Sequence, residues 1–342
     1  MSARTALLAS ALATATVALV CAAAPPVLTG PLAGRQVFPP TNWWNLDISK
    51  APLDPGSAAY IGFVSGRDAT HPTATRQVHD DFGPPPYGIP YVVVSGDQPL
   101  VRPTWTNYGD ESDEGAPGRP LGYPIPEEAK TQPNYIEGGV AGGGTGGDRH
   151  LLIVDKDNWL LYETGVTRWS TTASVWRADC GAIFDLRRSG RRPDTWTSAD
   201  AAGLAIFPGL VRYEEVYGAA EIMHAFRVTV RSTNGYVWPA SHVAGSTGGA
   251  LPMGARLRMK AAKNLSAFTP EMQRVFRAMK RFGLIVADNG TDMYVSGTMD
   301  ARWNNDVLNP AFHALTADDF EVVQLGWRGH PPTAPTNVHI VR

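Results

Sequence analysis

The chain of 342 residues contains little cysteine. Of its two cysteines, Cys21 lies in an N-terminal segment that we expect to be removed, which leaves Cys180 without a partner. An intramolecular disulfide and a cysteine-rich metal site are therefore excluded for the mature chain, and packing must supply its stability. We interpret Cys180 as a small buried hydrophobic residue rather than a nucleophile.

Charge is also scarce, because charged residues make up 18% of the chain and the formal net charge is −2. A chain of this kind has no electrostatic bias towards nucleic acid or an anionic membrane, so we expect no nucleic-acid partner. Hydrophobic residues reach 43%, while 35 glycines and 28 prolines interrupt them with frequent turns. This composition favours many short elements and disfavours a helical bundle.

One long apolar run is present, at the N-terminus. Arg4 precedes an alanine-rich stretch over residues 6–24, and small residues at its end, 22–24, fit a cleavage site. The run is only marginally long for a membrane span, which takes ~20 residues. We interpret residues 1–24 as a signal peptide and expect a secreted or extracytoplasmic protein with no integral membrane domain. An uncleaved anchor and lipid attachment at Cys21 are the alternatives.

The remaining chain predicts a mainly β fold, an antiparallel β-sandwich or jelly-roll-like structure with one or two covering helices. Residues 25–37 are interpreted as a Pro/Gly-rich linker, and residues 38–342 as a single β-rich catalytic or binding domain. Thr269 and Pro270 open the clearest amphipathic helix, and a short helix is expected over 197–204. Strands are expected at 91–95, 151–154, 159–163, 174–177, 182–186, 221–230, 236–238, 255–259, 284–287, 293–295 and 320–325.

The segment 221–242 is predicted to be a β-hairpin that carries a histidine on each arm. A turn centred on Thr233 places His224 opposite His242, with roughly 5 Å between their Cβ atoms. Residues 284–295 predict another hairpin, because Asp-Asn-Gly separates two apolar runs.

A third hairpin, over residues 151–163, is apolar on both faces and is therefore expected to be buried in the centre of the fold. A two-residue turn at 157–158 would place His150 and Glu163 on one face, whereas a three-residue turn would separate them. Asp155 and Glu163 would then be carboxylates at strand ends, where a substrate can reach them.

Signature motifs of zinc proteases (HExxH), serine hydrolases (GxSxG) and aspartic proteases (DTG or DSG) are absent from the sequence. What remains for a secreted β-rich chain is carbohydrate chemistry, and the first hypothesis is a glycoside hydrolase that cleaves a polysaccharide with two carboxylates. Ten tryptophans agree with stacking on sugar rings, although a tryptophan-rich core explains them equally well. The candidate catalytic residues are Glu163, Glu221, Asp155, His150, His224 and His242, and the candidate substrate-binding residues are Arg227, Trp238 and Trp159. Strand alternation sends Glu221 to the face opposite His224.

Two other functions stay open. A polysaccharide lyase would use His224 or His242 as its base and Arg227 to neutralise a uronate. A non-catalytic extracellular glycan-binding protein would bind without turnover.

Metal sites are conceivable at three places. The histidine cluster fits Zn²⁺, and an acidic loop containing Asp110, Glu111, Asp113 and Glu114 fits Ca²⁺. An exposed acidic loop without a metal is the competing interpretation of that segment. The cluster at 79–81, His-Asp-Asp, could likewise contribute to a metal or acid/base site, but we interpret it as solvent-exposed.

Overall fold

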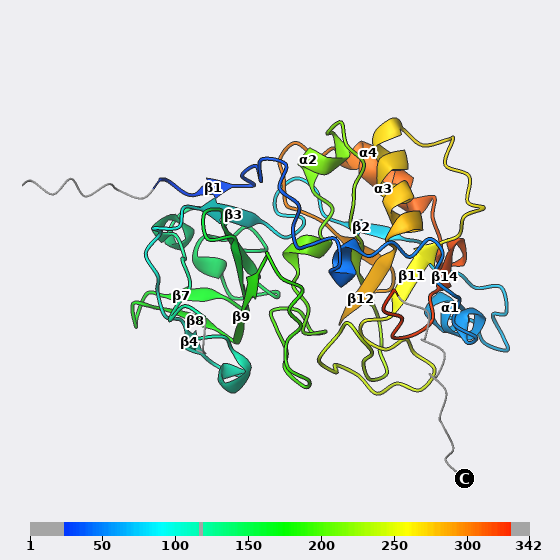
Figure 1. Ribbon diagram of the computed structural model, residues 1–342, viewed down its shortest axis with the longest axis horizontal. Helices are drawn as coiled ribbons and strands as arrows, with labels where there is room; N and C mark the ends of the chain where they lie inside the picture. The colour runs from blue at the N-terminus through cyan, green and yellow to red at the C-terminus, as the bar shows by residue number, and fades with distance from the viewer. Residues whose placement is uncertain (1–23, 116–118, 330–342) are drawn as a thin grey trace, which may run out of the picture.

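The computed structural model describes residues 24–115 and 119–329, and within these ranges fourteen strands form three mixed sheets (Figure 1). The five-stranded sheet runs in the order β1 (Val27–Leu28), β3 (Tyr91–Val94), β5 (Leu151–Asp155), β6 (Leu160–Gly165) and β9 (Cys180–Asp185). The six-stranded sheet runs in the order β14 (Phe320–Val322), β11 (Arg256–Met259), β12 (Leu284–Asn289), β10 (Phe226–Val230), β13 (Tyr294–Ser296) and β2 (His79–Asp81). The small sheet contains β4 (Thr104–Trp105), β8 (Val175–Ala178) and β7 (Arg168–Ser170).

Helices are few and short in the described residues. They are α1 (Ser57–Ser65), α2 (Tyr213–Val216), α3 (Pro270–Arg281) and α4 (Asn305–His313), with 3₁₀ turns at Trp43–Asn45, Gly109–Glu111, Glu127–Lys130, Ala141–Gly143, Phe207–Gly209 and Ala317–Asp319. Phe276 of α3 packs edge-on against Phe312 of α4, so the two helices lie side by side next to the six-stranded sheet (Figure 1). No helix in the described part of the chain is long and apolar enough to cross a membrane.

The expected mainly β structure is confirmed, but a purely antiparallel arrangement is wrong. Parallel pairs occur in every sheet, namely β3 with β5, β10 with β12, β13 with β2, and β4 with β8. Parallel neighbours need a long connection, which the irregular segments between these strands supply. The jelly-roll topology is not confirmed.

Two of the three predicted hairpins are also wrong, and β10 is the reason. This strand is buried along its whole length, and it pairs with β12 on one edge and β13 on the other. It therefore separates the two strands that were expected to form the hairpin over 284–295. It also has no partner in residues 236–242, so His224 and His242 do not face each other across a ladder.

The hairpin β5–β6 is confirmed, and it has the register of the two-residue turn. Leu152 pairs with Glu163 and Asp155 pairs with Leu160, which is the register of a turn at 157–158. The helix α3 also begins where expected, with Thr269 accepting a hydrogen bond from the Met272 amide. No helix forms over 197–204, which is a series of turns.

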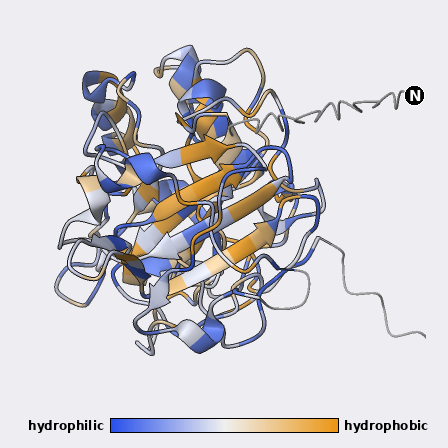
Figure 2. Cartoon of the chain, turned by 90° about the vertical axis from the view of Figure 1, so that its left-hand side faces the viewer, coloured by the Kyte–Doolittle hydropathy of each residue, from blue (hydrophilic) through white to orange (hydrophobic). Residues whose placement is uncertain are grey.

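One apolar core joins the two large sheets. Buried side chains from β3, β5 and β6 belong to the same cluster as those from β10, β11 and β12, and Phe207 of a 3₁₀ turn packs between them against Tyr91. Figure 2 shows the apolar residues concentrated along the strands and the polar ones in the loops. A second cluster fills the space between the five-stranded and three-stranded sheets.

Candidate active site

The polar face of the six-stranded sheet forms one side of the candidate site. In the register of this sheet Ser296 of β13 lies beside Asp81 of β2, and Val295 lies beside Val228 of β10. Arg227 therefore comes next to Ser296, and its Nη1 donates to Ser296 Oγ at 2.8 Å. Because side chains alternate along a strand, Arg227, Ser296 and Asp81 share one face while Val228 and Val295 point into the core.

A β-bulge brings a second carboxylate to this face. Val228 pairs with Val286, but Thr229 pairs with Asp288, so Ala287 is the extra residue in β12. Without this insertion Asp288 would point to the core side. With it, Asp288 Oδ2 accepts a hydrogen bond from Arg227 Nη2 at 2.8 Å.

The opposite side of the site comes from the chain that leads into β5. His150 directly precedes β5, and its Nδ1 lies 2.7 Å from Glu137 Oε2. The backbone ties these two residues together as well, since the Glu137 amide donates to the His150 carbonyl at 3.0 Å. Asp148 is exposed nearby, at the end of a glycine-rich stretch.

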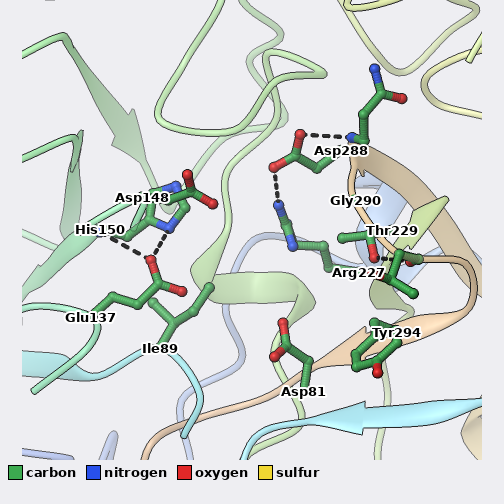
Figure 3. Close-up of a pocket in the computed structure, with 12 residues that line it drawn as sticks. Asp81, Ile89, Glu137, Asp148, His150, Arg227, Thr229, Asp288, Gly290 and Tyr294 are labelled. Carbon is green, nitrogen blue, oxygen red and sulfur yellow. Dashed lines mark hydrogen bonds and ion pairs between the residues drawn. The ribbon is translucent and has the colours of Figure 1, made fainter. Parts of the chain in front are cut away.

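These two sides enclose a pocket of about 280 Å³. Figure 3 shows Glu137, Asp148 and His150 on one side, Arg227, Asp288 and Tyr294 on the other, and Asp81 below them. The pocket is lined by Asp81, Ile89, Glu137, Asp148, His150, Arg227, Thr229, Asp288, Asn289, Gly290, Thr291 and Tyr294. Its walls thus gather four carboxylates and two basic side chains from segments far apart in the sequence.

Arg227 is fixed by a buried ionic network. Its Nε and Nη2 donate to the carboxylate of Asp200, which has no solvent exposure, and its remaining nitrogen donates to Ser296. Burial raises the pKa of Asp200 to about 6, although the nearby guanidinium opposes this shift. Burial alone would lower the pKa of Arg227, but Asp200 and Asp288 outweigh it, so Arg227 remains a cation.

His150 is held as an imidazolium. Its Nδ1 contacts Glu137, and its Nε2 lies 2.9 Å from the Ala199 carbonyl oxygen, an acceptor only, so both ring nitrogens carry a proton. Burial alone would lower the pKa of His150, yet the attraction and hydrogen bond of Glu137 raise it to about 9. In turn burial opposes ionisation of Glu137, but the His150 charge outweighs it and the pKa of Glu137 is lowered.

Asp81 has the opposite electrostatic character. Although its side chain is exposed in the pocket, the surrounding protein replaces part of its hydration and raises its pKa. Arg227 and His150 oppose this effect, while Glu137 and Asp148 reinforce it. The pocket therefore combines a carboxyl group that retains its proton more readily with one, Glu137, that is held ionised.

The structure brings two of the sequence-predicted residues, His150 and Arg227, to the pocket wall. Glu163 shares a face with His150, as the two-residue turn predicts, but it is fully buried and does not line the pocket. Its carboxylate accepts hydrogen bonds from the amides of Ile206 and Phe207 at 2.8–3.0 Å. Burial raises the pKa of Glu163 to about 7, and these amides partly offset the shift. Glu163 therefore anchors the turn that joins the sheets.

The other predicted carboxylates lie elsewhere. Glu221 is exposed and pairs with Arg277 of α3 at 2.7 Å. Asp155 caps the β5–β6 turn by accepting from the amides of Asp157 and Asn158. Neither side chain lines the pocket.

The remaining two histidines are separated from the pocket and from each other. His224 is buried, with Nε2 2.9 Å from Glu215 Oε2 and 3.0 Å from Arg212 Nη2. His242 Nδ1 lies 2.9 Å from the Ala201 carbonyl oxygen. The expected histidine cluster does not form, because β10 pairs with β12 and β13 instead.

The two tryptophans expected to bind substrate have structural surroundings. Trp159 is buried at the end of the β5–β6 turn, with the guanidinium of Arg35 stacked 3.5 Å above its ring centre. Trp238 packs edge-on against Trp43, with 6.2 Å between ring centres.

The acidic loop does not gather its carboxylates around one point. Asp113 pairs with Arg192 and accepts from the Ile183 amide, while Glu111 accepts from the Thr197 amide. Glu114 binds Arg102 and the Trp105 indole, and Asp110 lies in a 3₁₀ turn. Among the described residues no group of three His, Cys, Asp or Glu side chains is arranged to hold a metal ion, either at this loop or at the histidines.

Sequence reasoning did not single out Glu137 or Asp288. It favoured a solvent-exposed cluster at 79–81, and Asp81 is exposed, but it also lines the pocket. Glu137 lies in an irregular segment without a strand pattern, and Asp288 was assigned to a hairpin turn. The one available signal was the density of acidic and histidine residues at 79–81 and 148–150.

Comparison of the chain with protein-family models, with curated protein sequences and with solved structures gave no match. The assignment of function therefore rests on the chemistry of the pocket.

Proposed function

We propose that the protein is a secreted glycoside hydrolase that cleaves a polysaccharide in the pocket between the two large sheets. The supporting observation is a pair of carboxyl groups with opposed proton affinities: Asp81, whose pKa is raised, and Glu137, whose pKa is lowered. Glycosidic cleavage needs one carboxyl group to donate a proton and a second to act as an ionised base or nucleophile. Secretion is proposed from the sequence of residues 1–24, most of which lie outside the described residues.

In this proposal Asp81 protonates the leaving oxygen of the glycosidic bond. Among the described residues no side-chain hydrogen bond ends on the Asp81 carboxyl, so it is free to meet a substrate. Glu137 acts from the opposite wall as the ionised base or nucleophile. Its Oε2 accepts from His150, while its Oε1 accepts no hydrogen bond from the residues that the structure describes. His150 is a positioning residue that keeps Glu137 ionised and oriented.

The charge of the pocket favours an uncharged or amino sugar over a uronate. Four carboxylates line it, and its two cations are already engaged. All three nitrogens of the Arg227 guanidinium donate to protein acceptors. Both nitrogens of His150 are likewise occupied. These contacts also disfavour a lyase, which requires a free base and a cation available to a uronate.

The test is release of reducing ends from a panel of neutral, amino-substituted and acidic polysaccharides. We expect activity on a neutral or amino glycan, and a fall of about 100-fold or more in Asp81→Asn and Glu137→Gln, the usual scale for losing a general acid or base. Glu221→Gln is the matched control, because its carboxylate pairs with Arg277 outside the pocket.

Silence of the wild-type protein on the whole panel, or full activity in Asp81→Asn, would refute the hydrolase proposal. Binding of a glycan without turnover would identify the non-catalytic alternative, and an unsaturated, ultraviolet-absorbing product would identify a lyase.

A further inference from the structure

A second hollow adjoins the pocket. It is lined by Thr75, Arg76, Gln77, His79, Arg231, Gly290, Thr291 and Asp292 and has a volume of about 610 Å³. Gly290 and Thr291 line both spaces, so the two hollows meet across the turn that follows β12. The tyrosine at the pocket edge and the histidine of the second hollow are also in contact, since the rings of Tyr294 and His79 stack at 4.6 Å.

The second hollow offers hydrogen-bond donors that the fold does not use. Arg231 is engaged, because its Nη1 donates to Asp292 at 2.7 Å and its Nη2 to the Phe63 carbonyl. Arg76 differs, since its side chain is 53% exposed and its closest acidic group, Asp292, is 4.0 Å away. Among the described residues its guanidinium makes no hydrogen bond, so its N–H groups are free for hydroxyl groups of a ligand.

Resting on the proposed function, we propose that the second hollow binds further sugar units of the glycan chain that is cleaved in the pocket. The carboxylates of the pocket then act on a bond within a chain whose neighbouring units lie across Gly290 and Thr291 and reach Arg76. The enzyme is therefore selective for long oligosaccharides over short ones, and Arg76 contributes to that selectivity through hydrogen bonds.

Chain-length dependence tests this inference. On whichever neutral or amino glycan is cleaved, kcat/KM is measured for the trisaccharide and the hexasaccharide with the wild type, Arg76→Ala and a control, Arg188→Ala. Arg188 is 82% exposed and lines neither hollow. We expect the hexasaccharide to be the better substrate and Arg76→Ala to lower its kcat/KM by roughly tenfold, the scale of one lost hydrogen bond. The trisaccharide and the control should be unaffected.

Equal kcat/KM for the two lengths, or an equal effect of Arg76→Ala on both, would overturn the inference while leaving the hydrolase proposal intact. If no glycan is cleaved, the hydrolase proposal fails. Calorimetric titration with gluco-, xylo-, manno- and chito-hexasaccharides then tests whether the second hollow binds a glycan. Binding that Arg76→Ala weakens and that trisaccharides do not reproduce would support a glycan site. Absence of binding would overturn it.

Discussion

Arg227 stabilises the fold mainly by neutralising the charge of buried Asp200. The Asp200 carboxylate is entirely buried, and Arg227 is the cation that compensates its charge. At the same time Arg227 holds Asp288 at the pocket wall. Removing the cation that is hydrogen-bonded to a buried carboxylate costs far more stability than removing the partner of an exposed one, because water cannot replace the partner.

We therefore predict that Arg227→Met destabilises the fold by about 3–5 kcal/mol at pH 7. Burial favours the protonated form of Asp200, and the variant lacks the guanidinium that opposes this shift, so the loss should be smaller at pH 5 than at pH 7. Urea unfolding at the two pH values measures both effects. Arg281→Gln, which breaks an exposed pair with Asp47, is the control and should cost under about 1 kcal/mol. Equal losses in the two variants would contradict this account.

The pair of His150 and Glu137 predicts a pH dependence of stability. The folded-state pKa of His150 is about 9, above its ordinary value of 6.5, so the folded protein binds this proton more tightly than the unfolded chain. The stabilisation is fully present below about pH 6.5 and is lost as the pH rises through about 9. Glu137 has a lowered pKa, so its contribution is lost instead as the pH falls below its ordinary range.

The measurement is the difference in thermal midpoint between the wild type and Glu137→Gln from pH 6 to pH 10. We expect the wild type to be more stable at neutral pH and the difference to shrink as His150 deprotonates near pH 9. Taking the difference cancels the titration of groups common to both proteins. A difference that stays constant over this range would show that the two side chains are not coupled.

Single elements were predictable where local signals decide them. The β5–β6 hairpin has a turn flanked by two apolar runs, and its register fixed the shared face of His150 and Glu163. The helix α3 has its cap, its proline and its apolar spacing in one stretch of sequence. In both cases neighbouring residues determine the structure, so no knowledge of distant parts of the chain is needed.

Pairing between distant elements was not predictable, and the candidate site depends on it. The apolar residues of β10 predict a buried strand, but the neighbouring residues in the sequence do not show that its partners are β12 and β13. No sequence pattern predicts the bulge at Ala287, although this bulge turns Asp288 towards Arg227. Asp81 lies on a strand of three residues, too short for an alternating pattern to appear. The sequence therefore singled out Glu163, Glu221 and Asp155 as candidate carboxylates, whereas the pocket is lined by Asp81, Glu137, Asp148 and Asp288.

At the scale of the molecule, the pocket exists only while the two large sheets are packed together. Glu137 and His150 belong to the chain entering the five-stranded sheet, and Arg227 and Asp81 belong to the six-stranded sheet. The Glu163 carboxylate of β6 accepts from the amides of the turn whose Phe207 packs in the shared core. The expectation of a single domain over residues 38–342 requires that these sheets do not unfold separately.

We predict one cooperative unfolding transition in urea, with coincident curves from tryptophan fluorescence and far-ultraviolet circular dichroism. Native-state hydrogen exchange tests the same point for single strands. The amides of β5 and β10 should give equal free energies of opening, because the buried side chains of these strands belong to one apolar cluster. Two separated unfolding transitions would show that the sheets are independent units. A higher free energy of opening for one of the two strands would show the same. In that case loss of the proposed glycan cleavage should follow unfolding of the less stable sheet, since the carboxylates of the pocket would separate as soon as either wall unfolds.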